Sequence, residues 1–451
     1  MKLLPLSLIF FLILASCFCK SPFSYDHQTK TYVANHEPGV TGSGDCTITP
    51  FFSPDHSIDS LTKLIESATK TLDIGTPGWG SWSGCSYPHD GLIGCTVDYQ
   101  RDHERFTVFP AVLNALHRGV KVRILTNDFG SKPNNTVGLI DPLTFLQLAG
   151  AEVRYFTTVT FLHTKYIQVD RKTAAVSSVN FSYTSFMLNR EAGMILNGDG
   201  AQPLIDFLYG IFSFDFSQGL ILPDLKYSAS DMAIIKDTSI INYQMPTPVP
   251  FHNAYVSPST PFKLSSCSAE MTASPDFAKQ VVLKALGEAQ DSVAIMIYQI
   301  TDDVLCNTVH DIATDSDIKE FVLLVSNTIY SSYDWHEAQK CYAKLYKSGV
   351  KIQMTELDFY KYSHQKFWII DDHIVSMSTG NWSPTDYPDA PAIFPAYDTD
   401  PKEWRKTNRD YTIQLDNQPI AAVFRKVLDE DYKRGEPWVP TMGVKLVELE
   451  E

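Results

Sequence analysis

The stretch His163-Thr-Lys165-Tyr-Ile-Gln-Val-Asp170 is repeated further along the chain as His364-Gln-Lys366-Phe-Trp-Ile-Ile-Asp371. Both copies have the spacing H-x-K-x4-D. Each is followed, at the same distance, by a short stretch that supplies a hydroxyl and an asparagine: Ser177-Ser178-Val-Asn180 and Ser378-Thr379-Gly-Asn381. One copy would be weak evidence for chemistry. Two copies in equivalent places indicate a shared functional site.

The residues after each lysine predict that both motifs lie on β-strands, because β-branched and aromatic side chains favour strands. Side chains alternate between the two faces of a strand, so the histidine and lysine of each copy share one face. The two aspartates point the opposite way, and we expect them to brace the scaffold. The candidate catalytic residues of the two motifs are His163, Lys165, Asp170, His364, Lys366 and Asp371.

Two such faces, brought together, suit a phosphate group. One imidazole attacks phosphorus and forms a phosphohistidine, while the other protonates the leaving oxygen and later activates water. The lysines hold the phosphate oxygens as charge develops. We expect further phosphate contacts from the hydroxyls and amides that follow each motif, namely Ser178, Asn180, Thr379 and Asn381.

The pattern H-x-K-x4-D-x6-G-S-x-N, present twice, resembles that of the phospholipase D superfamily; Ser177 and Ser378 stand where that family has the first glycine. The resemblance implies that Glu191, in Asn189-Arg-Glu191, orients the nucleophilic imidazole. Asp410, in Asn408-Arg-Asp410, looks like its counterpart and follows an apparent insertion over 384–404. The resemblance favours His163 as nucleophile and His364 as acid, although the near symmetry of the motifs leaves the order open.

Matching patterns extend beyond the motifs. Strand-like runs alternate with amphipathic helical stretches in the same order on both sides of a proline-rich segment. We therefore predict an α/β fold of two pseudo-symmetric halves with mostly parallel sheets and the active site at their interface. The first half is expected over 46–245, the linker over 246–262 and the second half over 263–451.

The N-terminus predicts passage through the secretory pathway. Residues 1–19 have the charged start, apolar run and small residues of a signal peptide, with an uncleaved anchor as the alternative. Six cysteines remain after its removal, and an even number predicts disulfides in a secreted protein or a lysosomal or endosomal lumen. Cys85 and Cys95 are the easiest local closure, but six cysteines allow fifteen pairings and the sequence does not choose among them.

Two further stretches have more than one interpretation. Asn134-Asn-Thr136 is an expected glycosylation site, whereas the sequons at Asn180 and Asn381 coincide with the predicted active site. The aromatic residues Trp79, Trp82 and Tyr87 fit an interfacial anchor, a stacking platform or a packed loop, and we favour the packed loop.

Net charge bears on the partner. The chain carries a formal charge of -15 and has no basic run, which argues against a sequence-independent grip on long nucleic acid. The expected partners are a phospholipid at a membrane surface or a short single strand of nucleic acid. We expect no metal and no cofactor, because lysines and asparagines supply the donors and no paired C-x2-C spacing is present. The sequence predicts no oligomeric state.

Three functions are compatible with these patterns. The first, favoured by the acidic chain, is hydrolysis of phospholipids such as phosphatidylcholine to phosphatidic acid and free headgroup. The second follows from a closer resemblance to the lumenal, lysosomal branch of the family, which implies 5′ exonuclease action on single-stranded DNA or RNA. The third is a non-catalytic binding protein that keeps the fold, although both histidines and both lysines are present.

Overall fold

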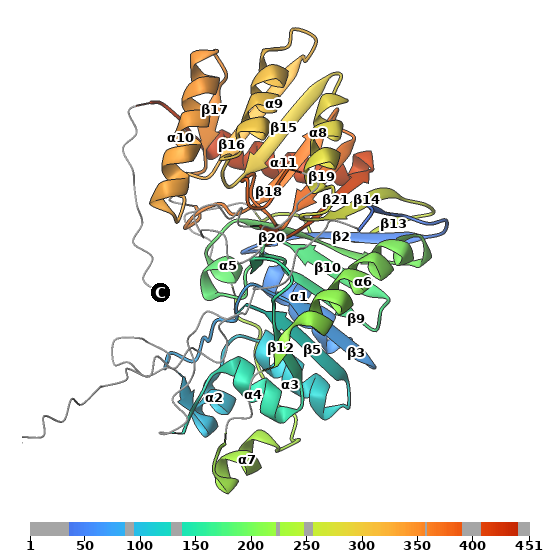
Figure 1. Cartoon of the computed structure of the whole chain (residues 1–451), viewed down its shortest axis with the longest axis vertical. Coiled ribbons are helices and arrows are strands. Elements are labelled where there is room, and N and C mark those ends of the chain that lie inside the picture. The colour runs from blue at the N-terminus through green and yellow to red at the C-terminus, as the bar shows by residue number, and fades with distance from the viewer. Residues whose placement is uncertain are drawn as a thin grey trace, which may run out of the picture.

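The computed structural model describes residues 36–85, 94–127, 138–221, 226–247, 256–356, 359–389 and 407–440. Two α/β halves lie one against the other. In Figure 1 the first half, blue to green, lies below the second half, yellow to red. Each half is built on one nine-stranded sheet, as the repeated pattern of the sequence predicts.

The first sheet has its motif strand at the centre. Its strands lie in the order β12 (Leu220–Ile221), β7 (Glu152–Tyr155), β5 (Lys121–Thr126), β3 (Thr71–Gly75), β9 (Tyr166–Val169), β10 (Thr173–Ser177), β11 (Glu191–Asn197), β2 (Cys46–Ser53) and β13 (Phe262–Leu264). The motif strand is β9, and every residue in it is buried.

The second sheet repeats this arrangement. Its strands lie in the order β1 (Gly39–Val40), β14 (Ser268–Ala273), β21 (Tyr411–Asp416), β19 (Ile374–Ser378), β18 (Lys366–Ile370), β15 (Ser292–Ile297), β16 (Glu320–Val325), β17 (Ile352–Met354) and β22 (Glu436–Pro437). The second motif strand is β18, which is also buried throughout.

The sheets are mixed, which corrects the expectation of mostly parallel pairing. The strands β3, β5 and β7 pair in parallel, as do β15, β16 and β17. The remaining pairs are antiparallel, because each motif strand turns straight back into the next strand as a hairpin, β9 into β10 and β18 into β19. A short turn permits only antiparallel pairing, whereas parallel neighbours need a long crossover.

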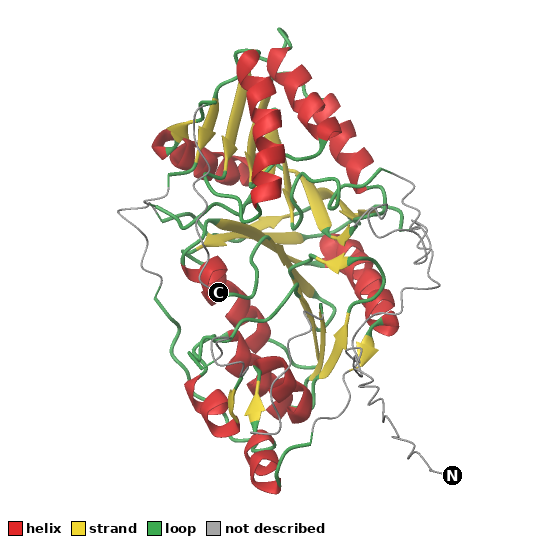
Figure 2. Ribbon diagram, turned by 60° about the vertical axis from the view of Figure 1, so that its left-hand side comes forward, coloured by secondary structure: helices red, strands yellow, loops and turns green. Residues whose placement is uncertain are grey.

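Helices cover the outer face of each sheet and also fill the space between the sheets (Figure 2). The outer helices of the first half are α1 (Ser57–Glu66), α3 (Val108–His117) and α4 (Pro142–Ala149), and those of the second are α8 (Ala278–Gly287), α9 (Asp303–Thr314) and α10 (Ser332–Lys347). The inner helices are α6 (Gln202–Gln218) and α11 (Gln418–Arg434). Three short helices, α2 (Val97–His103), α5 (Tyr183–Met187) and α7 (Ala229–Ile235), pack around the first half.

Alternation along the strands decides which core each residue enters. Phe51 and Phe52 are neighbours on β2 and both are fully buried, yet Phe51 packs under the outer helices of its own half while Phe52 packs between the halves. Phe52 meets Phe424 of α11 edge to face, with ring centroids 5.1 Å apart. The interface between the halves is therefore a hydrophobic core of its own.

The halves also exchange edge strands. The early strand β1 pairs with β14 of the second sheet, and β13, which follows the linker, pairs with β2 of the first. The predicted boundary at 263 falls within β13. A disulfide between Cys46 and Cys267 joins the starts of the two halves, with Cα atoms 5.9 Å apart.

The remaining four described cysteines also pair. Cys85 bonds Cys95, as the sequence favours, and Cys306 of α9 bonds Cys341 of α10. Among the described residues every helix is too short or too polar to span a bilayer. The predicted signal peptide at 1–19, the sequon Asn134-Asn-Thr136 and residues 248–255 of the predicted linker lie outside the described residues.

Two fully buried arginines cross the interface. Arg190, before β11, donates to Asp431 of α11 at 3.0 Å and to Asp55 of its own half at 3.1 Å. Arg409, of β20 (Asn408–Arg409), donates to Asp215 of α6 at 2.9 Å and pairs with Asp276 of its own half at 3.4 Å. Each guanidinium also donates to a backbone carbonyl, at Ser53 or Ser274. Each arginine therefore pairs with one aspartate of its own half and with one aspartate of the opposite half.

We expect Arg409→Met to destabilise the protein by about 3–5 kcal/mol, because it leaves two buried carboxylates without their cation. The free energy of unfolding, from denaturant titration, measures the effect. The matched control is Arg171→Met, whose ion pair with Asp206 is half exposed at both ends and which should change stability by less than about 0.5 kcal/mol. Equal effects of the two substitutions would contradict this account.

Candidate active site

Backbone hydrogen bonds place each motif histidine beside the other half. The amide of His163, between β8 (Phe161–Leu162) and β9, donates to the carbonyl of Arg409 at 2.9 Å. The amide of His364 donates to the carbonyl of Arg190 at 2.8 Å. Each histidine is therefore adjacent to the arginine-acid pair that follows the motif of the opposite half.

The acidic residues of those pairs bind the imidazoles across the interface. Nδ1 of His364 lies 3.0 Å from Oε2 of Glu191, and Nδ1 of His163 lies 3.0 Å from Oδ1 of Asp410. Asp410 thus occupies the place in the second half that Glu191 occupies in the first. With Nδ1 held by a carboxylate, each ring has Nε2 free for chemistry. The resemblance implies that the glutamate orients the nucleophile, and Glu191 contacts His364 of the second motif.

The two hydroxyls donate to the carboxylates in the structure, and their expected contacts to a phosphate stay a prediction. Ser178 Oγ donates to Glu191 Oε2 at 2.6 Å, and Thr379 Oγ1 donates to Asp410 Oδ1 at 2.6 Å. A hydroxyl has one proton to donate. With that proton engaged, Ser178 and Thr379 fix the acids that in turn hold the imidazoles.

One site residue, Asp386, escapes sequence reasoning. Its Oδ1 lies 3.3 Å from Nδ1 of His163, so this ring has two carboxylates beside it and His364 has one. Its other oxygen, Oδ2, accepts from the backbone amide of Asn381 and from the hydroxyl of Ser383, both at 2.9 Å. Asp386 lies at the start of the apparent insertion, at the position that Ser185 holds in the first half: the backbone amide of each donates to the serine hydroxyl three residues earlier. The repeat places a serine at this position, so it gave no signal for a carboxylate.

The motif lysines are buried, and one is unpaired. Lys165 donates to the carbonyls of His163 and Thr379. Lys366 Nζ has no hydrogen-bond partner among the described residues and lies 5.4 Å from the ring centroid of Tyr298. Burial lowers the pKa of Lys165 to about 8 and holds the pKa of Lys366 well below its usual value. A buried donor without an acceptor indicates a place for a ligand that accepts hydrogen bonds.

The two asparagines leave acceptors, and not donors, without partners. Oδ1 of both Asn180 and Asn381 is buried and has no partner among the described residues. The two amides follow the motif strands in equivalent positions, as the sequence predicts. Together with Lys366 they leave the interface with polar groups that the described part of the protein does not satisfy. Phosphate contacts by Asn180 and Asn381 stay a prediction.

The surroundings of the two imidazoles set their pKa values apart. Burial and Lys165 lower the pKa of His163, but the carboxylates of Asp410 and Asp386 outweigh them and raise it above its ordinary value. Burial, with help from Lys366, lowers the pKa of His364 to about 4 against the opposing pull of Glu191. Two nearly identical motifs therefore hold one imidazole whose protonated form is favoured, His163, and one whose neutral form is favoured, His364.

Asp170 and Asp371 lie at the opposite ends of the motif strands from this cluster, about 15 Å away at the rise of a strand. Asp170 accepts hydrogen bonds from the amides of Thr69, Lys70 and Thr71. Asp371 accepts from those of residues 290–292. Both aspartates adopt a left-handed backbone conformation, with φ near 52°. They brace the start of the neighbouring strand, as the alternation of side chains predicts, and their listing with the candidate catalytic residues has no contact with the imidazoles to support it among the described residues.

His163, Asp386 and Asp410 are also close enough to hold one metal ion, with a ligand atom from each within 4.8 Å of the others. The carboxylate oxygens there already accept protein hydrogens. Asp410 Oδ1 accepts from Thr379, and Asp386 Oδ1 accepts from the Asn408 amide. Both carboxylates also contact Nδ1 of His163, at 3.0 and 3.3 Å, so an imidazole held by two acids accounts for the cluster. The absence of a metal requirement stays a prediction.

Aromatic rings border the site. Tyr298 packs edge to face against the ring of His364, with ring centroids 4.9 Å apart. Tyr362 packs in the same way, with ring centroids 6.0 Å apart. The neighbouring Tyr330, 63% exposed, donates its backbone amide to the hydroxyl of Tyr298 at 2.7 Å. By contrast, Trp79 and Trp82 pack against Phe106, which fits the packed-loop interpretation; Tyr87 lies outside the described residues.

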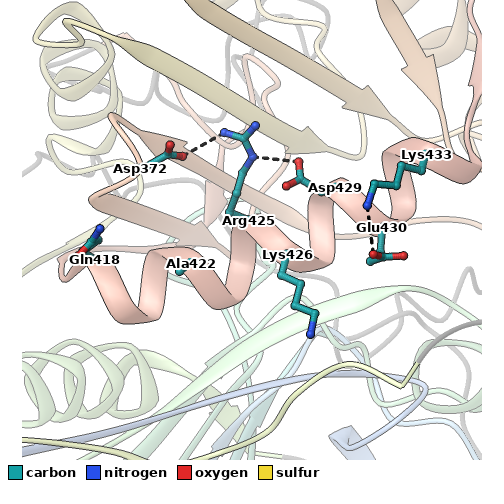
Figure 3. Close-up of a pocket in the computed structure, with 8 residues that line it drawn as sticks. All are labelled: Asp372, Gln418, Ala422, Arg425, Lys426, Asp429, Glu430 and Lys433. Carbon is teal, nitrogen blue, oxygen red and sulfur yellow. Dashed lines mark hydrogen bonds and ion pairs between the residues drawn. The ribbon is translucent and has the colours of Figure 1, made fainter.

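A separate pocket of about 380 Å³ lies along α11 (Figure 3). Five of the six charged side chains that line it pair with one another: Arg425 with Asp372 at 3.0 Å and with Asp429 at 2.9 Å, and Lys433 with Glu430 at 3.3 Å. Neither motif histidine lines it. These mutually paired surface charges form a solvated helix face and not a catalytic site.

The chain is similar to a known protein family and to several solved structures. The family model described as "Cardiolipin synthase, PLD-like domain" matches residues 61–207 and 282–432, one stretch in each half. Phosphatidylserine synthase of Haemophilus influenzae Rd KW20 is similar in fold, with a TM-score of 0.55, 12% identity and 87% of each chain covered. Nuc of Salmonella typhimurium, a phospholipase D family member, is similar at 17% identity with a TM-score of 0.29. The match covers 42% of this chain and 100% of the Nuc chain. A search of curated protein sequences finds no match.

The crossed partnership gives a direct test. We expect Glu191→Gln to lower the pKa of His364 further, because it removes the carboxylate that favours the imidazolium, and to leave the ring signals of His163 nearly unchanged. Histidine ring NMR over a pH series measures both. Activity should fall by about 10²–10⁴-fold. Glu152→Gln, at an exposed position of β7, is the control, and a change confined to His163 would contradict the pairing.

Proposed function

Because the chain belongs to the family described as cardiolipin synthase, PLD-like domain, within the phospholipase D superfamily, we propose that it hydrolyses phosphodiesters through a phosphohistidine intermediate. One observation carries the proposal. Two imidazoles come from equivalent motifs in the two halves, and each is held through Nδ1 by a carboxylate of the opposite half. This leaves one nitrogen of each ring available to a shared substrate.

The chemistry needs both rings. Nε2 of one imidazole attacks phosphorus and forms a nitrogen–phosphorus bond, while the leaving oxygen takes a proton from the other imidazole. That second ring then takes a proton from water as the water oxygen attacks phosphorus and releases the first ring. Lys165 and Lys366 stabilise the charge that develops on the phosphate oxygens. The carboxylates beside the rings stabilise whichever imidazolium forms.

We propose a phospholipid as substrate, with phosphatidic acid and a free headgroup as products. The family description names a cardiolipin synthase, and a phosphatidylserine synthase shares the fold. The net charge of -15 disfavours long polyanions. The exposed tyrosines Tyr183, Tyr330 and Tyr333 suit the level of lipid headgroups, where one end of the ring is wet and the other apolar.

A second substrate, the 5′ end of single-stranded DNA or RNA, is favoured by one observation. Tyr330 is exposed and hydrogen-bonds to Tyr298, whose ring packs on His364. A base stacked on Tyr330 would lie within reach of a phosphate at the imidazoles. Base stacking of this kind tolerates any sequence and needs only a short strand.

We further propose that the protein works in the secretory pathway, either secreted or in a lysosomal or endosomal lumen. The signal-peptide pattern at 1–19 supports this location. So does the pairing of all six cysteines that follow that segment, because disulfides persist in oxidising compartments.

Side-by-side assays separate the candidate substrates. We expect purified protein to release choline from phosphatidylcholine vesicles faster than it shortens a 5′-labelled oligonucleotide, at pH 5 and at pH 7. His163→Ala and His364→Ala should each abolish turnover of either substrate. Tyr330→Ala should lower the rate on whichever of the two substrates the wild-type protein cleaves faster. Tyr346→Ala, which removes an exposed ring packed beside Trp438, should leave that rate unchanged. Inactivity on every phosphodiester would favour the non-catalytic binding protein.

Hydrolysis should survive EDTA, because lysines and imidazoles supply the charge that a metal supplies in other phosphodiesterases. The rate with and without chelator, after dialysis, measures this. Loss of activity in EDTA, followed by recovery on addition of zinc or magnesium, would instead indicate an ion at His163, Asp386 and Asp410.

A further inference from the structure

The two motif histidines differ in one respect that the repeat does not predict. His163 has carboxylates from Asp410 and Asp386 within 3.0 and 3.3 Å of Nδ1, whereas Nδ1 of His364 has Glu191 at 3.0 Å and the backbone carbonyl of Ser178 at 3.2 Å. The second carboxylate at His163 comes from the apparent insertion after the second motif. It therefore breaks the symmetry of the site.

From this geometry we infer that His364 is the nucleophile and His163 the general acid, and that Asp386 is the positioning residue that fixes this division of roles. The inference rests on the proposed phosphohistidine mechanism and deepens it. It reverses the order that the family resemblance favours.

The groups around His163 favour its protonated form. Asp410 and Asp386 both face Nδ1, and the opposing cation is Lys165. The two acids are buried side by side: ionisation of Asp386 is favoured by His163, and proximity to Asp386 helps to raise the pKa of Asp410. At least one full negative charge thus stays beside the ring. A ring that carries a proton at neutral pH is ready to give it to a leaving oxygen.

The groups around His364 favour its neutral form. Glu191 is the carboxylate there, with Lys366 and Lys165 as cations and Tyr298 and Tyr362 as the aromatic walls. The ring is 8% exposed, so little water reaches it to stabilise a charge. Its Nδ1 donates to Glu191 and leaves an electron pair on Nε2. That pair is what a nucleophile must offer to phosphorus.

The opposite assignment requires the less populated protonation state. With a pKa of about 4 for His364 and a raised pKa for His163, a neutral His163 beside a protonated His364 is a rare combination. That combination would take the proton from the ring that two carboxylates face and put it on the ring that one carboxylate faces. The assignment inferred here places the proton beside the two carboxylates.

The atoms balance in both steps. Nε2 of His364 forms the bond to phosphorus as the bond to the leaving oxygen breaks, and that oxygen takes the proton of His163. His364 is then a cationic phosphohistidine whose Nδ1 proton faces Glu191. In the second step water loses a proton to His163, its oxygen bonds phosphorus, and His364 leaves as neutral imidazole.

An activated leaving group separates the two roles. Bis(p-nitrophenyl) phosphate releases p-nitrophenolate, which departs without a proton, whereas choline leaves phosphatidylcholine only with one. We expect His163→Ala to lose choline release by about 10²–10⁴-fold yet still give one p-nitrophenolate per enzyme in a rapid burst. Mass spectrometry at neutral pH should then find the phosphoryl group on His364. His364→Ala should give no burst.

The controls distinguish this inference from the underlying function. A wild-type enzyme that cleaves neither substrate would defeat the proposed function itself. A wild-type enzyme active on both, with the burst in His364→Ala and the phosphoryl group on His163, would overturn the assignment, as would a burst from neither variant. His163→Gln and His364→Gln, checked by thermal unfolding, repeat the comparison if an alanine variant does not fold.

Asp386 has its own readout. Asp386→Asn should move the alkaline limb of the pH–rate profile for choline release toward acid, because the general acid then loses its proton more readily. If His163 were the nucleophile, the same substitution would move the acid limb and raise the rate at low pH. Asp389→Asn, at an exposed aspartate three residues away that pairs with Lys279, is the matched control. An unshifted profile in Asp386→Asn would overturn the positioning role.

Discussion

Arg190 and Arg409 hold the two halves in the only arrangement in which the active site exists. Each arginine is fully buried and binds an aspartate on the inner helix of the opposite half. The residue after each arginine is the carboxylate that binds an imidazole of that opposite half. A shift of one half against the other would therefore unpair a buried charge and misplace a catalytic ring at once. Stability and chemistry depend on the same contact.

This coupling explains why the halves are equivalent in fold and unequal in charge. Equivalent contacts recur around the two imidazoles: histidine amide to arginine carbonyl, hydroxyl to carboxylate, and carboxylate to imidazole. Duplication alone would give two rings with the same proton affinity. A reaction that needs one ring with a proton and one without needs a departure from symmetry, and Asp386 supplies it.

Sequence reasoning predicted most of what depends on local pattern. The two halves, the strand positions of both motifs and the bracing by Asp170 and Asp371 follow from alternation and repetition. Two features depend on what meets across the interface, and spacing within one half cannot reveal them: the pairing of Glu191 with His364 and the second acid at His163. The use of Ser178 and Thr379 on carboxylates depends on which strands lie side by side within one half, which the motif spacing alone does not give. The parallel sheets were overestimated because the tight turns after each motif strand force antiparallel hairpins.

The disulfide between Cys46 and Cys267 has a consequence for survival among proteases. It spans a sequence separation of 221 residues and joins the starts of the two halves. A single backbone cut anywhere between these cysteines leaves the two pieces covalently attached. The exchanged strands β1 and β13 hold each piece to the sheet of the other. A chain clipped in the connector would thus migrate as two fragments only after reduction, and nicked and intact molecules could coexist in one working population.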